Sequence, residues 1–216
     1  MMAIGSKIMA IGMVAFSLAI GFLSFYLFSD LTKEEKKKHM EVLISQFIHF
    51  LLFIWLGKIV LNLSIFLTDP FSILAYPSDS KAFYFAIVLM AIFLFYQSRR
   101  KNMNVLPLME SFVHIFLISS FVYEFIQFVI EDNPYAFGYF ILLAILIGGF
   151  FFLKERVPGT MLLIIQVTAW SIGMMSLAFV QPYVTVFGYM MAPWFIGLFF
   201  IASIGSLTYQ LRKRDA

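Results

Sequence analysis

The sequence predicts an all-α membrane protein, a bundle of seven transmembrane helices that forms one domain over residues 1–216. Its composition is 62% hydrophobic and 12% charged, whereas soluble domains have roughly 45–50% apolar and about 25% charged residues. Several apolar runs reach the ~20 residues that a helix needs to cross ~30 Å of hydrocarbon. Because these runs use most of the chain, we expect a multi-pass protein held in the lipid bilayer of the plasma membrane.

Three apolar spans are predicted in the first half of the chain, at residues 8–29, 42–67 and 82–98. The charged connection 30–41 is expected to be a solvated cytoplasmic turn that also contains a helix start. The connection 68–81 carries aromatic residues among its prolines and charges, which is typical of segments that lie in the membrane interface.

Four further spans are predicted at residues 105–131, 135–153, 160–180 and 184–208. A basic connection, 97–104, precedes the first of them. Short turns separate the others, because acidic residues, proline and glycine interrupt the apolar pattern between them.

The basic residues predict how the helices are oriented in the membrane. Cytoplasmic loops carry an excess of lysine and arginine, and here the basic residues fall on alternate connections and on the C-terminal tail. Only Lys7, Lys58 and Lys81 depart from this pattern. We therefore expect the N-terminus outside and the C-terminus in the cytoplasm. The residues that define the pattern are Lys33, Lys36, Lys37, Lys38, Arg99, Arg100, Lys101, Lys154, Arg156, Arg212, Lys213 and Arg214.

The fourth span carries three ionisable residues, Glu110, His114 and Glu124. At 100° per residue they fit a stripe about 80° wide, and Gln127 extends this stripe toward the outside. Charged groups inside a bilayer cost about 2.5–3.5 kcal/mol or more, so they usually mark functional positions. The stripe predicts an interior helix with a polar face.

The second span offers partners for that face. His49 is expected near the depth of Glu110 and His114, and Lys58 within about one turn of Glu124. Since His49 and Lys58 are nine residues apart and lie on opposite sides of an ideal helix, we expect one of the two pairings. Asn62 of the second span and Gln166 of the sixth are secondary polar positions.

Two interpretations of these polar groups have most support. In the structural one, Lys58 and Glu124 form a compensating ion pair, and Glu110 and His114 hydrogen-bond across helices. In the other, the residues form a proton or ion pathway, because histidine titrates near neutral pH and spaced carboxylates carry protons through membranes. Pro193 would act as a hinge there by releasing a helical carbonyl in the seventh span.

Two less favoured interpretations involve chemistry at His114. Glu110 and His114 would serve a lipid-modifying enzyme as acid and base, although Ser111 points away from them and no catalytic motif is present. His49 and His114 would be the two axial ligands of a haem, or would join Glu110 in a metal site. Cysteine chemistry is excluded, because the chain has no cysteine.

The leading functional hypothesis is movement or sensing of protons or a small solute through the polar face of the fourth helix. The second is a non-catalytic accessory subunit, or a homo-oligomer, because Gly5, Gly12 and Ala19 form a small-residue stripe suited to helix packing. The net charge of +3 reflects the orientation pattern, so no nucleic-acid partner is expected.

Overall fold

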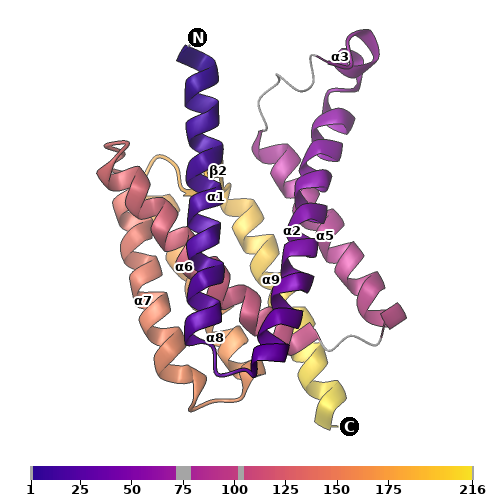
Figure 1. Ribbon diagram of the computed structural model, residues 1–216, viewed down its shortest axis with the longest axis vertical. Coiled ribbons are helices and arrows are strands. Elements are labelled where there is room, and N and C mark those ends of the chain that lie inside the picture. The colour runs from indigo at the N-terminus through magenta and orange to yellow at the C-terminus, as the bar shows by residue number, and fades with distance from the viewer. Residues whose placement is uncertain (1, 72–78, 102–104, 216) are drawn as a thin grey trace. The chain divides into compact units, whose positions relative to one another are not determined.

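The computed structural model describes residues 2–71, 79–101 and 105–215 and is 84% helical, which confirms the all-α class. In the described part of the chain, six helices are long and apolar enough to cross a membrane. The predicted connections 68–81 and 97–104 lie partly outside the described residues. The six helices are α1 (Met2–Phe28), α2 (Lys33–Leu61), α5 (Ser80–Lys101), α6 (Val105–Val129), α7 (Ala136–Lys154) and α8 (Gly159–Val180) (Figure 1).

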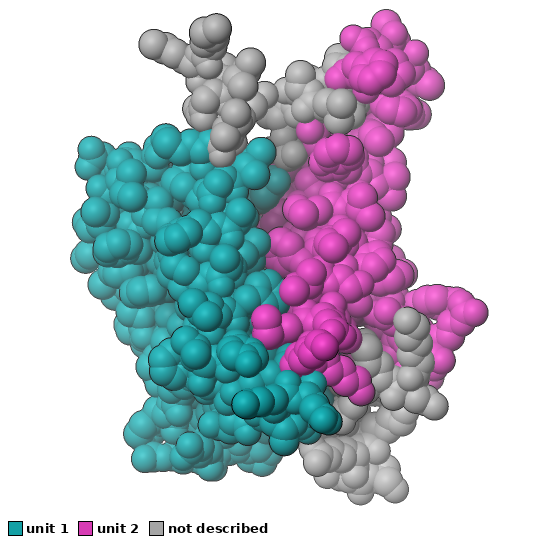
Figure 2. Space-filling model, viewed as in Figure 1, with its two compact units in different colours: residues 1–36, 106–216 teal, residues 37–105 magenta. Residues whose placement is uncertain are grey.

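The chain divides into two compact units (Figure 2). Unit 1 comprises residues 1–36 and 106–216, and so contains α1, α6, α7 and α8 together with the C-terminal elements. Unit 2 comprises residues 37–105 and contains most of α2, the short helix α3 (Leu63–Thr68) and α5.

Unit 1 is a helix bundle in which α6 touches several neighbours. Helix α1 approaches α6 where Gly21 faces the backbone of Ile115. Helix α7 packs on α6 through the stacked rings of Phe121 and Phe140, whose centroids are 4.5 Å apart. Helix α8 packs against α7 and against the C-terminal helix. These contacts give α6 neighbours on more than one side within unit 1.

A β-hairpin follows α8 in unit 1. Strands β1 (Thr185–Val186) and β2 (Tyr189–Met190) pair antiparallel, and Phe187 and Gly188 form the turn. Both turn residues have positive φ angles, 49° and 82°, as a type I′ turn requires. The ring of Phe187 packs on Tyr123 of α6 at 5.5 Å, so contacts with α6 hold a backbone conformation that phenylalanine rarely adopts.

The predicted seventh span, 184–208, therefore begins as a hairpin, and its helix, α9 (Pro193–Asp215), starts nine residues later. Pro193 is the first residue of α9, a position that proline favours because no helical N–H is needed there. Tyr189 lies in β2, so its carbonyl is not a helical acceptor that Pro193 leaves without a partner. The mechanism predicted for a Pro193 hinge inside a helix is thus wrong.

The predicted helix start in the connection 30–41 is confirmed, since α2 begins at Lys33. Thr32 and Glu35 form a capping box: the Glu35 carboxylate accepts a hydrogen bond from the Thr32 N–H at 3.0 Å, and the Thr32 hydroxyl accepts one from the Glu35 N–H at 3.3 Å. The second predicted span is interrupted at Asn62, which separates α2 from α3.

In unit 2, α2 and α5 pack together at three levels. Gln46 Nε2 donates to Gln97 Oε1 at 2.9 Å, and the ring of His49 stacks on Phe93 at 4.8 Å. Farther along, Gly57 lies so close to the backbone of α5 that a methyl group there would be 3.1 Å from a carbonyl oxygen. The pair is thus a closely packed helical hairpin.

Candidate functional site

Helix α6 carries the predicted polar stripe, and all three ionisable residues of that stripe belong to unit 1. His114 and Glu124 are only 3% and 1% exposed, while Glu110 is half-buried. Helix α6 also has the largest buried share of the six candidate spans. His114 and Glu124 therefore lie away from the surface, as expected for an interior helix.

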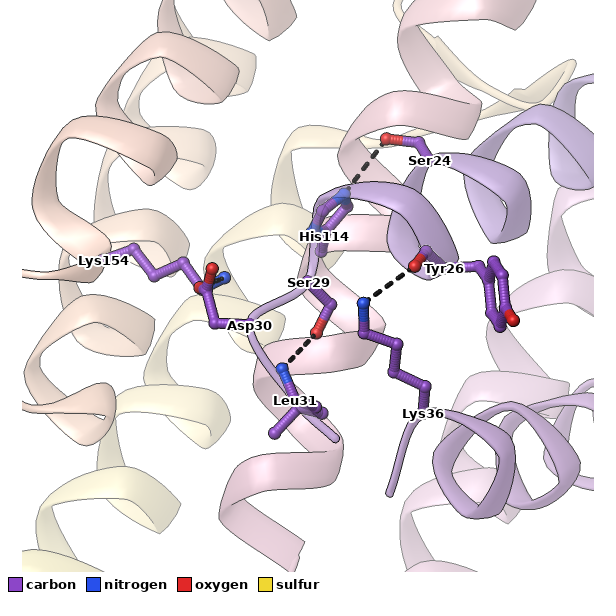
Figure 3. A network of polar contacts seen from close by, with 8 residues as sticks. All are labelled: Ser24, Tyr26, Ser29, Asp30, Leu31, Lys36, His114 and Lys154. Carbon is purple, nitrogen blue, oxygen red and sulfur yellow. Dashed lines mark hydrogen bonds and ion pairs between the residues drawn. The ribbon is translucent and has the colours of Figure 1, made fainter. Parts of the chain in front are cut away.

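His114 is enclosed by aromatic rings and bonded to α1. Its Nε2 lies 3.1 Å from the hydroxyl oxygen of Ser24 (Figure 3). Phe25, Phe150 and Phe151 meet the imidazole edge-on, with centroid distances of 5.7, 5.7 and 5.2 Å. Whether the imidazole donates to or accepts from Ser24 depends on the ring nitrogen that carries the proton.

An ion pair lies near His114, at the ends of α1 and α7. Asp30, in the connection after α1, pairs with Lys154, the last residue of α7 (Figure 3). The Asp30 side chain is 73% exposed and that of Lys154 is 23% exposed. The hydrogen bond from Lys154 lowers the pKa of Asp30, and this effect outweighs partial burial. The pair ties the end of α1 to the end of α7.

Lys36 adds a second tie at the same end of unit 1. Its Nζ donates to the carbonyl of Tyr26 at 2.9 Å, so the first turn of α2 is bound to the last turns of α1 (Figure 3). A lysine near a helix C-terminus stabilises carbonyls that have no partner within the helix. The connection between α1 and α2 is thereby held at both of its ends, by Lys36 and by Asp30.

The side chain of Glu110, on α6, lies against the first residue of α8. Its carboxylate is so close to Gly159, the first residue of α8, that a methyl group on Gly159 would overlap it. Helix N-termini attract negative charge, and Lys154 is a second electrostatic partner for Glu110. Glu110 therefore lies against a helix N-terminus and also interacts electrostatically with a cation.

Glu124, on α6, belongs to a second cluster of polar residues, which is buried in the helix bundle. Tyr139 of α7 is fully buried and lies near both Ser120 and Glu124. The indole Nε1 of Trp170, on α8, donates to the Tyr139 hydroxyl oxygen at 3.0 Å. Among the described residues, Glu124 Oε1 and Ser120 Oγ have no hydrogen-bond partner. The cluster joins polar groups from α6, α7 and α8 around a buried carboxyl group.

The other predicted primary residues, His49 and Lys58, lie in α2 and belong to unit 2. Nδ1 of His49 lies 2.6 Å from the Ser45 carbonyl oxygen one turn earlier. Lys58 is buried, and its carbonyl accepts a hydrogen bond from the side chain of Asn62 at 2.9 Å. The predicted pairing of Lys58 with Glu124, and the pairings of His49 with residues of α6, stay predictions.

The secondary residues Gln127 and Gln166 have local partners. Gln127 Nε2 donates to the Tyr123 hydroxyl at 3.4 Å on the same helix. Gln166 is buried, and its Nε2 donates to the carbonyl of Leu146 on α7 at 3.2 Å. Gln166 thus links two helices of unit 1 through a main-chain acceptor.

Sequence reasoning missed several members of both clusters. Lys154 was assigned to a cytoplasmic connection by its charge, although it directly follows an apolar run and can turn its ammonium group toward the bundle. Ser24, Ser120 and Tyr139 carry no charge, and nothing in their spacing separates them from other small or aromatic residues of the spans. Trp170 could have been predicted to donate a hydrogen bond, because a buried indole N–H usually has an acceptor.

A comparison of the chain with protein-family models, with curated proteins and with solved structures gives no match. Within the described ranges, no group of three or more histidine, aspartate or glutamate side chains is placed to hold a metal ion.

Proposed function

We propose that the protein moves protons or a small solute across a membrane, or senses one, through the polar face of α6. One observation carries this proposal: His114 and Glu124, 3% and 1% exposed, lie on one stripe of a helix long enough to span a bilayer. Ionisable groups buried at membrane depth are costly and are typical of ion pathways and proton relays.

The arrangement along α6 suits stepwise transfer. Glu110 and His114 are separated by about 6 Å of helix rise, and His114 and Glu124 by about 15 Å. Serines 119 and 120 lie in the longer interval, and both are buried. Glu110 interacts electrostatically with Lys154 at one end of the stripe, while Glu124, 1% exposed, lies at the other end.

The proposed membrane topology has seven crossings, with the N-terminus outside, the C-terminus in the cytoplasm, and the plasma membrane as location. The hairpin and α9 together would make the seventh crossing. The chain has no cysteine, so single cysteines at the exposed positions Glu131 and Glu155 can be tested with an impermeant maleimide. We expect E131C to be labelled on intact cells and E155C only after permeabilisation; the reverse pattern would reject this orientation.

Purified protein in liposomes tests the transport proposal. We expect an imposed pH gradient to collapse faster with the wild-type protein than in empty liposomes, and E124Q to abolish the difference. E131Q is the matched control, because Glu131 is an exposed glutamate just beyond α6. If wild-type liposomes show no flux of protons, common ions or small solutes under any gradient, the transport proposal is wrong.

A second candidate function is that of an accessory subunit or homo-oligomer. Gly12 and Ala19 are exposed on α1, and a methyl group on Gly12 would meet no atom within 4 Å. This face of α1 suits close approach by another membrane helix. Co-purification of a stoichiometric partner in mild detergent, lost in a G12L variant, would support this function, and a lone monomer would count against it.

A further inference from the structure

We propose that Glu124, Ser120 and Tyr139 form a site that binds one proton, with Trp170 as a positioning residue. This inference rests on the proposed function and deepens it, since it names the ion and the side chains that hold it. Ser120, Tyr139 and Trp170 were not among the predicted site residues. The site draws on three different helices, α6, α7 and α8.

The backbone places the first two groups together. Ser120 and Glu124 are one turn apart on α6 and differ by about 40° in direction. Both side chains are 1% exposed. Tyr139 approaches them from α7 and is close to both. The carboxyl group thus has two hydroxyl groups beside it in a region without solvent access.

Trp170 restricts what the Tyr139 hydroxyl can do. An indole N–H only donates, so the 3.0 Å contact means that the Tyr139 oxygen accepts from Trp170. The phenolic O–H is then left to donate elsewhere, and its neighbours Ser120 and Glu124 are acceptors. Trp170 therefore leaves the Tyr139 hydroxyl to donate within the cluster, where Ser120 is its hydrogen-bonding neighbour and Glu124 an electrostatic one.

A proton on Glu124 satisfies the remaining groups. Glu124 Oε1 and Ser120 Oγ have no hydrogen-bond partner within the described ranges, and a bare carboxylate only accepts. Once protonated, the acid donates to Ser120 while its other oxygen accepts from Tyr139. A neutral acid also avoids the large desolvation cost of an isolated charge in an apolar interior.

The surroundings fit a proton better than a metal cation. The cluster offers the oxygens of Glu124, Ser120 and Tyr139, whereas Ca²⁺ takes six to eight oxygen ligands and Mg²⁺ requires an octahedral set. Among the described residues of unit 1, the phenols of Tyr139 on α7 and Tyr123 on α6 interact electrostatically with Glu124. Lys58 of α2 is the counter-charge predicted from the sequence. Infrared spectra distinguish a protonated Glu124 from a Glu124 carboxylate that is paired with Lys58.

Infrared difference spectroscopy on the full chain in lipid tests the site without measuring transport. The wild-type minus E124Q spectrum should contain the carbonyl band of a protonated carboxylic acid at neutral pH. S120A and Y139F should each shift that band, because each removes a hydrogen-bonding group, and W170F should shift it through Tyr139. The wild-type minus E131Q spectrum is the control and should contain only carboxylate bands.

Three results would overturn the proposal. Loss of the acid band on addition of Na⁺, K⁺ or Ca²⁺ at constant pH would show a metal-cation site. A carboxylate band in wild type that becomes an acid band in K58M would show an ion pair with Lys58. An acid band unmoved by S120A and by Y139F would show that Glu124 is protonated outside this cluster. If the infrared spectra show the proton site but liposomes show no flux, the proposed function is wrong and the proton site stands.

Discussion

Ser24 Oγ and His114 Nε2 lie 3.1 Å apart and join two helices across 90 residues of sequence. This contact is a polar link between α1 and the stripe on α6, and aromatic rings surround it. Since His114 is 3% exposed, Ser24 supplies a partner that water cannot easily replace. The link gives α1 a part in the candidate site.

Loss of the Ser24 hydroxyl should destabilise the bundle. S24A removes a hydrogen-bond partner from a buried imidazole, and we expect the free energy of unfolding to fall by about 1–3 kcal/mol, measured by denaturation in detergent. S17A is the control, because the buried Ser17 hydroxyl donates to a carbonyl of its own helix, that of Met13. A cost for S17A equal to that for S24A would contradict this explanation.

Gly21 should be intolerant of any side chain. A methyl group there would overlap the Ser119 hydroxyl and lie 2.8 Å from the Ile115 carbonyl oxygen, a main-chain atom that cannot turn away. We expect G21A to cost about 1–3 kcal/mol of unfolding free energy through overpacking.

G12A on the same helix is the matched control for G21A. No atom lies within 4 Å of a methyl group at Gly12, so the gain in helix propensity should leave G12A neutral or about 1 kcal/mol more stable. Similar melting temperatures for G12A and G21A would mean that α1 and α6 are not in close contact.

Substitution of Gly159 should destabilise the protein by displacing the side chain of Glu110. G159A forces the carboxylate away from the start of α8, so we expect about 1–3 kcal/mol of destabilisation together with impaired flux. Shortening the acid should relieve the overlap, and the double variant E110A/G159A should lose less than the two single losses added together. A double-mutant cycle of melting curves checks this, and strict additivity would contradict it.

The Asp30–Lys154 pair should make stability depend weakly on pH. Because the pair lowers the pKa of Asp30 in the folded state, it stabilises the fold above the unfolded value of about 3.9. That stabilisation is lost as the pH falls through the lowered pKa. Asp30 is largely exposed, so D30N should cost at most about 1 kcal/mol near neutral pH.

Melting curves of wild type and D30N from neutral pH to strong acid test this prediction: the two should begin to converge below about pH 4 and should coincide only below the lowered pKa of Asp30. E41Q is the control, because Glu41 forms an exposed pair with Lys37 at 3.9 Å that should contribute almost nothing. A difference between wild type and D30N that persists in acid would show that Asp30 acts through packing.

The sequence predicted the existence of six of the helices, because apolar runs of membrane length leave few alternatives, but the second predicted span, 42–67, missed that α2 runs from Lys33 to Leu61. The predicted spans 105–131 and 160–180 differ from α6 and α8 by two residues or fewer at each end. The stripe on α6 was also predicted, since helical periodicity alone fixes which residues share a face.

The hairpin before α9 could not be predicted in the same way. Residues 184–192 are as apolar as a helix of this protein, and Phe187 is an unusual choice for a turn with positive φ. Its contact with Tyr123 is a tertiary one. The clusters around His114 and Glu124 escaped prediction for a related reason: Ser24, Tyr139 and Trp170 become partners only once the helices pack.

The late start of α9 has a consequence for the surrounding lipid. Its apolar part, Pro193–Thr208, is roughly 24 Å long at 1.5 Å per residue, shorter than the ~30 Å hydrocarbon core of an average bilayer. In the proposed seventh crossing, the hairpin would supply the missing length, or local thinning of the membrane or shorter lipid tails would relieve the mismatch. If α9 crosses the membrane as proposed, the protein should respond to acyl-chain length, with α9 as the helix on which bilayer thickness acts.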